Sequence, residues 1–396
     1  MLFILSFVSF NNAIGNNNNI SYLNLKNENQ LNSLAKLTID LANDIYCRDI
    51  QESDCDDCFD FINDSKYSNG NVIKKINDEG LIPKTIIYDF NGNDNISKIR
   101  IIAIRGTHTK REWKNNFDFI EKHGKDLGIN IDGWFHPGYA NSSIILWNKI
   151  RKYIIKCEYP VVLTGHSRGA SISEIIHVIA KEKNPKQPIY CMSYGPSPPM
   201  ILYKNVTELT NDIYVFINEN DPIPRITMKN LLNIKFPFSW GLKIGSYLRI
   251  PFSFLSLGKK TLTEFFKALS ELINDSHKNY AIKEFVENFE QIIRYTLICI
   301  KNPEKCRLSN QVGRVFRLQW VDDKSTYPIL QRGCMKKSLF DLELNKDRKD
   351  EIPKINDIAE LEQHTNDHKP RFYRRVLHVP VCEPSNNEQP LICPDE

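Results

Sequence analysis

The chain has 396 residues, of which 41% are hydrophobic and 25% are charged, and its formal net charge is +4. These fractions are close to globular averages and exclude a disordered, collagen-like or coiled-coil chain. The sequence pI of about 8.4 is lower than the pI above ~9 that is typical of nucleic-acid-binding domains, so no nucleic-acid partner is expected. At ~150 residues per domain the length suggests two or three domains, although a large α/β enzyme can use most of it as one.

The N-terminus opens with an apolar run from Leu2 to Phe10. This run is too short to cross a bilayer, which takes ~20 residues. Ala13 and Gly15 are small residues at the −3 and −1 positions of a cleavage after Gly15, as in a signal peptide. We therefore expect residues 1–15 to be a signal peptide and the mature protein to be secreted or lumenal. The alternative is an N-terminal core strand or helix.

The cysteines are consistent with a secretory route. There are ten, an even number, and in an oxidising compartment they can be interpreted as disulfides. Only Cys55 and Cys58 form a CxxC pair. No second close pair or histidine set has zinc-ligand spacing, so we expect no metal site. Glycosylation is also expected, although its evidence is weak: the six N-x-S/T sites (Asn19, Asn63, Asn95, Asn141, Asn205 and Asn274) barely exceed chance.

Predicted helices and strands alternate through the first half of the chain. Hydrophobic periodicity predicts helices over 31–46, 142–155 and 167–181, and strands over 84–89, 98–105, 160–164, 189–194 and 213–217. Asn91-Gly92 between the first two strands is a hairpin turn signal. Alternating strands and helices predict an α/β fold with a mostly parallel central sheet flanked by helices.

The pattern changes after residue 227. Apolar residues at helical spacing predict a helical insertion over about 227–312. Strand patterns return at 313–321 and 338–344, a polar loop follows at 345–356, and a last helix is predicted over about 370–378. We expect one domain over 16–396 that includes this insertion.

A GxSxG motif carries the strongest chemical signal. Gly165-His166-Ser167-Arg168-Gly169 follows a buried strand and precedes a helix. This context predicts a tight strand-to-helix turn that presents the Ser167 hydroxyl at the carboxyl end of the sheet as a nucleophile. A helix N-cap serine is the structural alternative.

A serine nucleophile needs a base and an orienting acid, in the chain order Ser, acid, His. The acid predicted here is Asp221, which follows an apolar strand and precedes Pro222; Glu219 and Asp212 are its rivals. The histidine candidates that follow are His277, His364, His368 and His378.

At this point the chain resembles the class 3 lipases, the fungal triacylglycerol lipase type. The resemblance is carried by IIAIRGTHTKREW at 101–113, FHPGYANS at 135–142, GHSRGA at 165–170, NENDPIP at 218–224 and DHKPRFYRRVL at 367–377. It implies an α/β-hydrolase fold and selects His368 as the base over His364. It also implies an oxyanion hole built from Thr107 and from the backbone N–H of Arg168. The family usually has Leu or Gln where Arg168 stands; the implied role needs only the Arg168 amide, and a cation near the acyl site could affect substrate choice.

The resemblance extends to two disulfides. YCRDIQESDCDDC at 46–58 is similar to the start of the fungal enzymes, which implies that Cys47 pairs with Cys393 and that Cys55 pairs with Cys58. A pair between Cys299 and Cys306 is a local guess. His136 and His166 also match family positions, and we interpret both as structural.

The spacing between Asp221 and His368 is longer than in compact fungal lipases. PSPPM at 196–200 and GRVFRLQW at 313–320 resemble the diacylglycerol lipase branch instead. The aromatic residues of the insertion (Phe236, Phe238, Trp240, Tyr247, Phe252 and Phe254) predict either a satellite core, which we favour, or a lid or lipid-docking surface.

The resemblance implies a lipase that hydrolyses acylglycerol esters through an acyl-enzyme and needs no cofactor or metal. Its expected partner is an acylglycerol or phospholipid at a lipid–water interface, with peripheral rather than integral membrane contact. Phospholipase A1 or diacylglycerol lipase activity is the nearest alternative. A non-catalytic lipid-binding or interaction protein of the same fold is a more distant one.

Overall fold

The computed structural model describes residues 22–47, 69–107, 116, 120–218, 221, 223–225, 308, 311–318, 320–321, 334–335, 343–344 and 368–378. Several predictions concern residues outside these ranges. They are the signal peptide over 1–15, the Cys55–Cys58 and Cys299–Cys306 pairs, the partner cysteine Cys393, the loop over 345–356 and nearly all of the insertion over 227–312.

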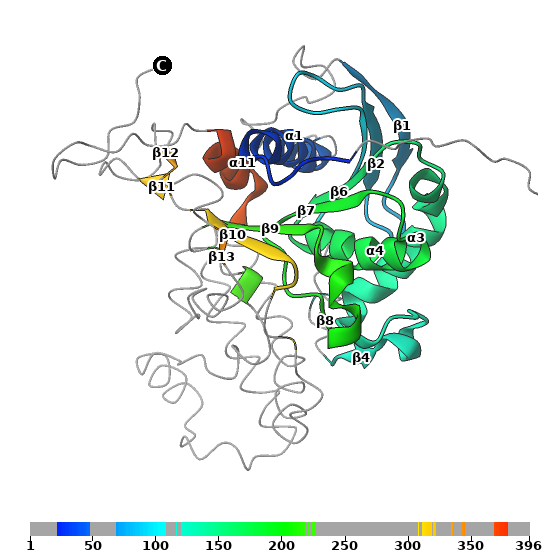
Figure 1. Ribbon diagram of the computed structural model, residues 1–396. Coiled ribbons are helices and arrows are strands. Elements are labelled where there is room, and N and C mark those ends of the chain that lie inside the picture. The colour runs from blue at the N-terminus through cyan, green and yellow to red at the C-terminus, as the bar shows by residue number, and fades with distance from the viewer. Residues whose placement is uncertain are drawn as a thin grey trace, which may run out of the picture.

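The described part is built around an eight-stranded sheet (Figure 1). Its spatial order is β1 (Gly70–Ile76), β2 (Thr85–Phe90), β3 (Ile99–Ile104), β6 (Val161–His166), β7 (Ile189–Tyr194), β9 (Ile213–Asn218), β10 (Arg314–Leu318) and β13 (Glu343–Leu344). The five strands from β3 to β10 are parallel, whereas β1, β2 and β13 pair antiparallel at the two edges. The predicted mostly parallel α/β sheet is therefore confirmed.

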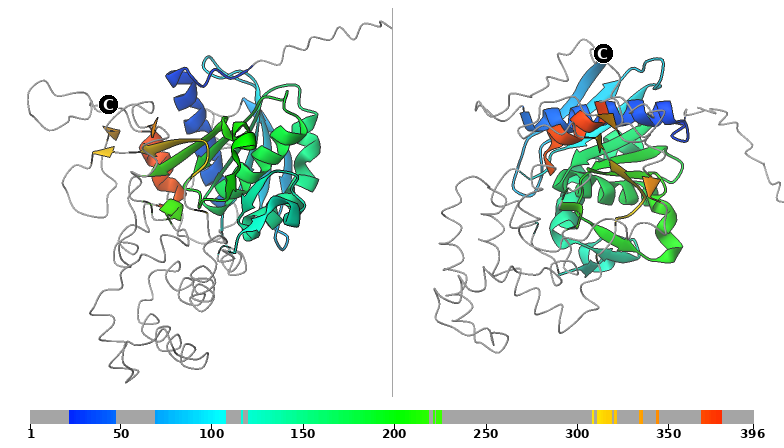
Figure 2. Two further views of the ribbon diagram at one scale, coloured as in Figure 1. Left: turned by 60° about the horizontal axis from the view of Figure 1, so that its bottom comes forward. Right: turned by 90° about the vertical axis from the view of Figure 1, so that its left-hand side faces the viewer.

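In the described part of the chain, α-helices cover both faces of this sheet, as the two views of Figure 2 show. Helices α1 (Glu28–Cys47) and α11 (Pro370–His378) lie side by side on one face, although they come from opposite ends of the sequence. Helices α3 (Pro137–Ile155) and α4 (Arg168–Lys183) pack on the other. The central strands are buried on both faces, which explains why they have continuous apolar runs rather than an alternating pattern.

Most predicted elements are found close to their expected positions. The helix predicted over 370–378 has the same bounds as α11, and the strand predicted over 189–194 has those of β7. Helix α3 begins at Pro137, earlier than the predicted residue 142, because proline is favoured at the first helical position, where no hydrogen bond from its nitrogen is needed. Strands β2 and β3 do pair antiparallel, but residues 91–98 join them instead of a two-residue turn.

Several short or polar strands of the structure are not predicted from the sequence. Strand β1 has three exposed residues in a row, Ile73, Lys74 and Lys75, and its register with β2 shifts between Val72 and Lys74. This bulge breaks the alternation that identifies a half-buried strand. Also missed were β4 (Lys122–His123), β5 (Gly133–Phe135) and β8 (Met200–Leu202), which form a small antiparallel sheet, and β12 (Cys334–Met335), which pairs with β11 (Trp320–Val321).

The sequence predicts disulfides among the ten cysteines, but two of the cysteines are not in one. Cys157 and Cys191 are free and buried, the first just after α3 and the second within β7. Burial raises the pKa of both thiols, because the thiolate loses its hydration there. Both therefore act as small core residues. Among the described helices, none is long and apolar enough to cross a membrane.

Candidate active site

The turn between β6 and α4 presents Ser167 in a strained conformation. Its φ of 57° makes it the only non-glycine residue with positive φ in the described part of the chain. The glycines on either side allow the helix to approach the sheet closely: a Cβ on Gly169 would lie 2.1 Å from the carbonyl oxygen of Ile104. A Cβ on Gly165 would lie 2.5 Å from the carbonyl carbon of Gly169. The Ser167 hydroxyl is thereby presented at the carboxyl end of the parallel strands.

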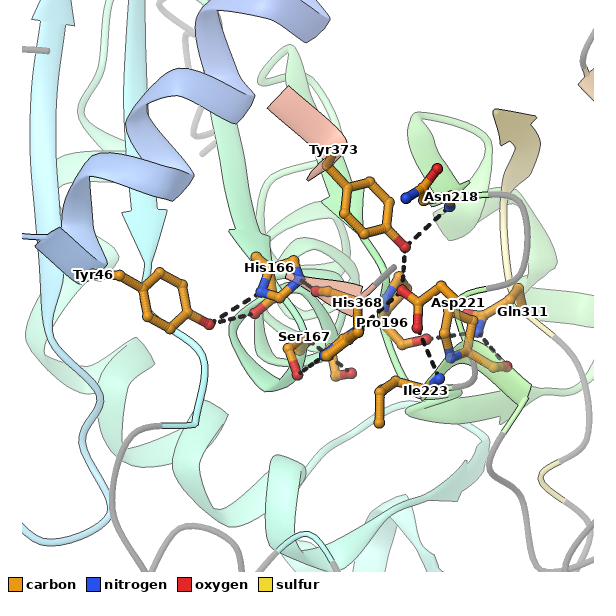
Figure 3. Close-up of polar contacts among 12 residues, drawn as sticks. Tyr46, His166, Ser167, Pro196, Asn218, Asp221, Ile223, Gln311, His368 and Tyr373 are labelled. Atoms are coloured by element: carbon orange, nitrogen blue, oxygen red, sulfur yellow. Dashed lines mark hydrogen bonds and ion pairs between the residues drawn. The ribbon is translucent and has the colours of Figure 1, made fainter. Parts of the chain in front are cut away.

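The three predicted triad side chains meet at this edge of the sheet (Figure 3). The Nε2 atom of His368 lies 2.8 Å from Ser167 Oγ, and its Nδ1 atom lies 2.9 Å from Asp221 Oδ2. With a proton on Nδ1 donated to the carboxylate, Nε2 is left with the lone pair that faces the Ser167 hydroxyl. Asp221 is fully buried, whereas the His368 side chain is 16% exposed. An arrangement of this kind can activate a serine hydroxyl by a base that a carboxylate orients.

Asp221 is held by more than the histidine. Its Oδ2 accepts a hydrogen bond from the Tyr373 hydroxyl, and its Oδ1 accepts one from the Ile223 amide at 2.9 Å. Gly195 makes room for this cluster, because a Cβ there would lie 2.7 Å from both Asp221 Oδ2 and the Tyr373 oxygen. Tyr373 is in the sequence segment that carried the resemblance, but it was given no role. Its position five residues after His368 was the only signal.

Two rivals of the predicted residues are engaged elsewhere. Asp212 pairs with Lys181 at 2.7 Å, and Nε2 of His378 lies 2.9 Å from Asp40 Oδ1 on the α1 side. The remaining rivals, Glu219, His277 and His364, lie outside the described residues.

Thr107, the predicted oxyanion residue, follows the end of β3. The parallel pairing of Ile104 with Gly165 puts the ends of β3 and β6 next to each other. The Thr107 hydroxyl accepts a hydrogen bond from Asn116 Nδ2 at 2.8 Å. The main-chain carbonyl of Asn116 is in turn 3.1 Å from Nε2 of the buried His136. Burial lowers the pKa of His136 to about 3, so this imidazole is neutral and donates from Nε2. No sequence pattern singles out Asn116.

The Arg168 side chain is buried. Its guanidinium is 1% exposed and donates to Ser142 Oγ at 2.6 Å and to the Leu81 carbonyl at 3.4 Å. The charge is thus held inside the protein, between α4, α3 and the Leu81 segment. The buried charge is therefore not exposed to solvent beside Ser167. The main-chain N–H of Arg168, in contrast, lies at the start of α4 directly after Ser167.

The ranges that the structure describes contain no set of side chains suited to bind a metal ion. No group of three or more His, Cys, Asp or Glu side chains there is arranged to hold a metal ion.

Residues 101–231 match the family model of class 3 lipases. The predicted resemblance to class 3 lipases is confirmed. The matched segment includes the described strands from β3 to β9 and both Ser167 and Asp221, whereas His368 comes after it. The described sheet, with its strained serine between β6 and α4, is that of an α/β-hydrolase fold.

Individual class 3 lipase relatives are distant. Mouse diacylglycerol lipase-beta is 26% identical over 145 residues, which are 34% of this chain but only 21% of that protein. Among solved structures, a Rhizomucor miehei lipase propeptide complex is 15% identical, with a TM-score of 0.37 and coverage of 50% of this chain and 63% of that one. The Lip2 lipase of Yarrowia lipolytica is 19% identical, with a TM-score of 0.38 and coverage of 49% and 73%.

Proposed function

We propose that this protein is a serine ester hydrolase that cleaves acylglycerols through Ser167, His368 and Asp221. The observation that carries the proposal is the continuous hydrogen-bonded series from Ser167 Oγ to His368 to Asp221, with distances of 2.8 and 2.9 Å, at a serine of positive φ. Strained backbone is concentrated at functional sites, because a fold tolerates its cost of ~1–3 kcal/mol only where the surroundings enforce it. A helix N-cap serine does not explain it, because the Ser167 side chain makes no cap hydrogen bond.

The proposed reaction follows from these contacts. His368 takes the Ser167 proton as the oxygen attacks the ester carbonyl, and the imidazolium is stabilised by the Asp221 carboxylate. The main-chain N–H groups of Thr107 and Arg168, with the Thr107 hydroxyl, stabilise the oxyanion. His368 then gives its proton to the leaving alcohol. A water activated by His368 hydrolyses the acyl-enzyme to release the fatty acid, which regenerates the Ser167 hydroxyl. No metal or organic cofactor takes part.

The choice of acylglycerol as substrate rests on the class 3 lipase match and therefore belongs to the proposal. The match to mouse diacylglycerol lipase-beta favours diacylglycerol as a second candidate substrate. Phospholipase A1 activity is the other alternative. Since a lipid ester lies at an interface, we propose peripheral contact with that surface. Secretion or a lumenal location and the signal peptide over 1–15 stay predictions.

Hydrolysis of a soluble short-chain ester and of emulsified acylglycerols by the purified protein tests the proposal. We expect turnover by the wild type and a loss of about 10⁴-fold or more in kcat for Ser167→Ala, since a lone triad member contributes little once its partner is removed. Ser197→Ala is a matched control, because Ser197 is buried near the same loops but lies outside the series. A wild type that is folded and inactive on every lipid class tested contradicts the proposal.

A further inference from the structure

His166, the residue before the proposed nucleophile, lies between α1 and the proposed base. Its Nδ1 atom is 3.2 Å from the Tyr46 hydroxyl in the last turn of α1, and its Nε2 atom is 2.5 Å from the main-chain carbonyl oxygen of His368. Figure 3 shows the His166 ring between Tyr46 and His368. The rings of His166 and His368 are 4.5 Å apart between centroids.

The two contacts select one form of His166. A carbonyl oxygen can only accept, so Nε2 carries the proton that it donates to His368, and Nδ1 keeps a lone pair that accepts from the Tyr46 hydroxyl. His166 is 3% exposed, and this burial, together with the charge of His368, lowers its pKa well below the usual value. The imidazole is therefore neutral at ordinary pH. It adds no positive charge beside His368 when that ring becomes protonated.

This contact gives His368 a second point of attachment. Asp221 orients the His368 ring through Nδ1, whereas His166 holds the main chain of the same residue. Since His166 and Ser167 are consecutive at the end of β6, the strand that presents the nucleophile also holds the backbone of the base. Relative movement of the two reacting groups is thereby restricted from both sides.

Tyr46 also contacts the strand end that precedes Thr107. A Cβ on Gly106 would lie 2.0 Å from the Tyr46 hydroxyl oxygen and 2.5 Å from the His166 carbonyl oxygen. The absence of a side chain at Gly106 thus leaves the space that the hydroxyl occupies. The last turn of α1 therefore contacts both the residue before Thr107 and the residue before Ser167.

We propose that Tyr46 and His166 are positioning residues that hold His368 by its main-chain carbonyl and so keep its Nε2 atom in line with Ser167. This inference rests on the proposed function. It predicts that the loss of the Nε2 donor at position 166 lowers kcat without a comparable change in KM, because substrate contacts are not involved.

The test compares three purified variants on a soluble short-chain ester. His166→Leu removes the donor, and we expect kcat to fall about 10- to 100-fold, the size expected for small misplacement of a catalytic group, with KM within about 2-fold. His166→Gln keeps an N–H donor near the Nε2 position, and it is expected to recover most of the lost kcat. His177→Leu removes another fully buried neutral histidine, on α4, and should leave kcat unchanged.

Two outcomes overturn the inference. One is a folded His166→Leu variant with the kcat of His177→Leu, and the other is a His166→Gln variant as slow as His166→Leu. If His166→Leu does not fold, Tyr46→Phe decides, since it removes a single oxygen. We expect its kcat to fall about 2- to 10-fold, in keeping with one hydrogen bond, and an unchanged kcat contradicts the role of Tyr46.

Labelling with a fluorophosphonate separates this inference from the proposed function. If the wild type is not labelled, the result contradicts both the proposed function and the inference. If the wild type and the His166→Leu variant are labelled at equal rates, the result supports the proposed function and contradicts the inference alone.

Discussion

The two faces of the central sheet differ in chemistry as well as in the helices that cover them. Under α3 and α4 the strands contribute mainly branched aliphatic side chains, among them Ile102, Leu163, Val215 and Val315. Under α1 and α11 half of the buried strand side chains are aromatic, and they come from β2, β7, β9 and β10: Tyr88, Phe90, Tyr190, Tyr194, Tyr214, Phe216 and Phe316. Aromatic rings stack across this second face, as in the pairs Tyr194–Phe216 and Phe216–Phe316, with centroids 5.1 and 5.2 Å apart.

The aromatic face also carries polar contacts that join α1 to β7 and to α11. The Tyr194 hydroxyl donates to the Ala35 carbonyl at 2.7 Å, and the buried Asp40 of α1 accepts from Arg374 Nε of α11 at 2.7 Å. These contacts fix the position of α11, which begins two residues after His368. The aliphatic face instead supports α4 and the turn that presents Ser167. The aliphatic face thus supports Ser167 through local structure. The aromatic face supports His368 through contacts between residues that are distant in sequence.

Among the predictions that compare the two faces, the largest effect is expected when the contact between α1 and α11 at Asp40 is removed. Asp40 is fully buried and its Oδ1 contacts both Arg374 and His378. Because those partners are only partly buried, we expect Asp40→Ala to lower the free energy of unfolding by about 2–3 kcal/mol, less than for a fully buried pair. We also expect kcat to fall about 10-fold as His368 loses its support.

Chemical denaturation and ester hydrolysis on the same preparation measure both effects of Asp40→Ala. Asp132→Ala is the matched control, because Asp132 makes an Asp–His contact with His123 at the surface, where such pairs contribute ~0–1 kcal/mol. An Asp40→Ala variant with wild-type kcat contradicts the link between this contact and the base.

On the aliphatic face we expect a change in stability without a change in catalysis. Ser142→Ala removes an acceptor of the buried Arg168 guanidinium, and we expect a loss of about 1–2 kcal/mol in the free energy of unfolding. Ser143→Ala, one residue along α3, has only neutral carbonyl partners and should cost less. Thermal unfolding measures both, and kcat should stay at the wild-type value. A fall in kcat for Ser142→Ala shows that the Arg168 contact supports the site after all.

The smallest expected effect is on how the free energy of unfolding changes as the pH falls below neutral. Burial lowers the pKa of His177 to about 3, below its usual 6.5, so the unfolded chain binds a proton as pH falls through 6.5 that the folded chain does not bind. Stability is therefore lost between about pH 6.5 and 3. His177→Leu should flatten the dependence of the free energy of unfolding on pH by up to about 1.4 kcal/mol per pH unit in that range. Urea titrations at pH 7.5, 6 and 5 measure the slope, and an unchanged slope shows that His177 is protonated in the folded protein.

The sequence predicted those parts of the fold that depend on local pattern. The elbow around Ser167 and the strands β3, β6, β7 and β9 follow from apolar runs, glycine spacing and order along the chain. The placement of His368 next to Ser167 required the family pattern, because four later histidines satisfied the chain order equally well.

Other features depend on packing that no local pattern encodes. Strand β1 was missed because the bulge at Ile73 breaks its alternation. The central strands are apolar throughout, so nothing in them indicated which face carries aromatic side chains or which helices cover it. The burial of the Arg168 guanidinium against Ser142 and the contact of His166 with His368 likewise arise from segments that meet only in the folded chain.

The central claim is that Ser167 is a nucleophile activated by His368. Its most direct test is intact-mass and peptide mapping of the protein after reaction with a fluorophosphonate. We predict one covalent adduct per chain, located on Ser167, that is absent in Ser167→Ala and forms far more slowly in His368→Ala. A folded wild type that forms no adduct, or an adduct located on another residue, contradicts the account.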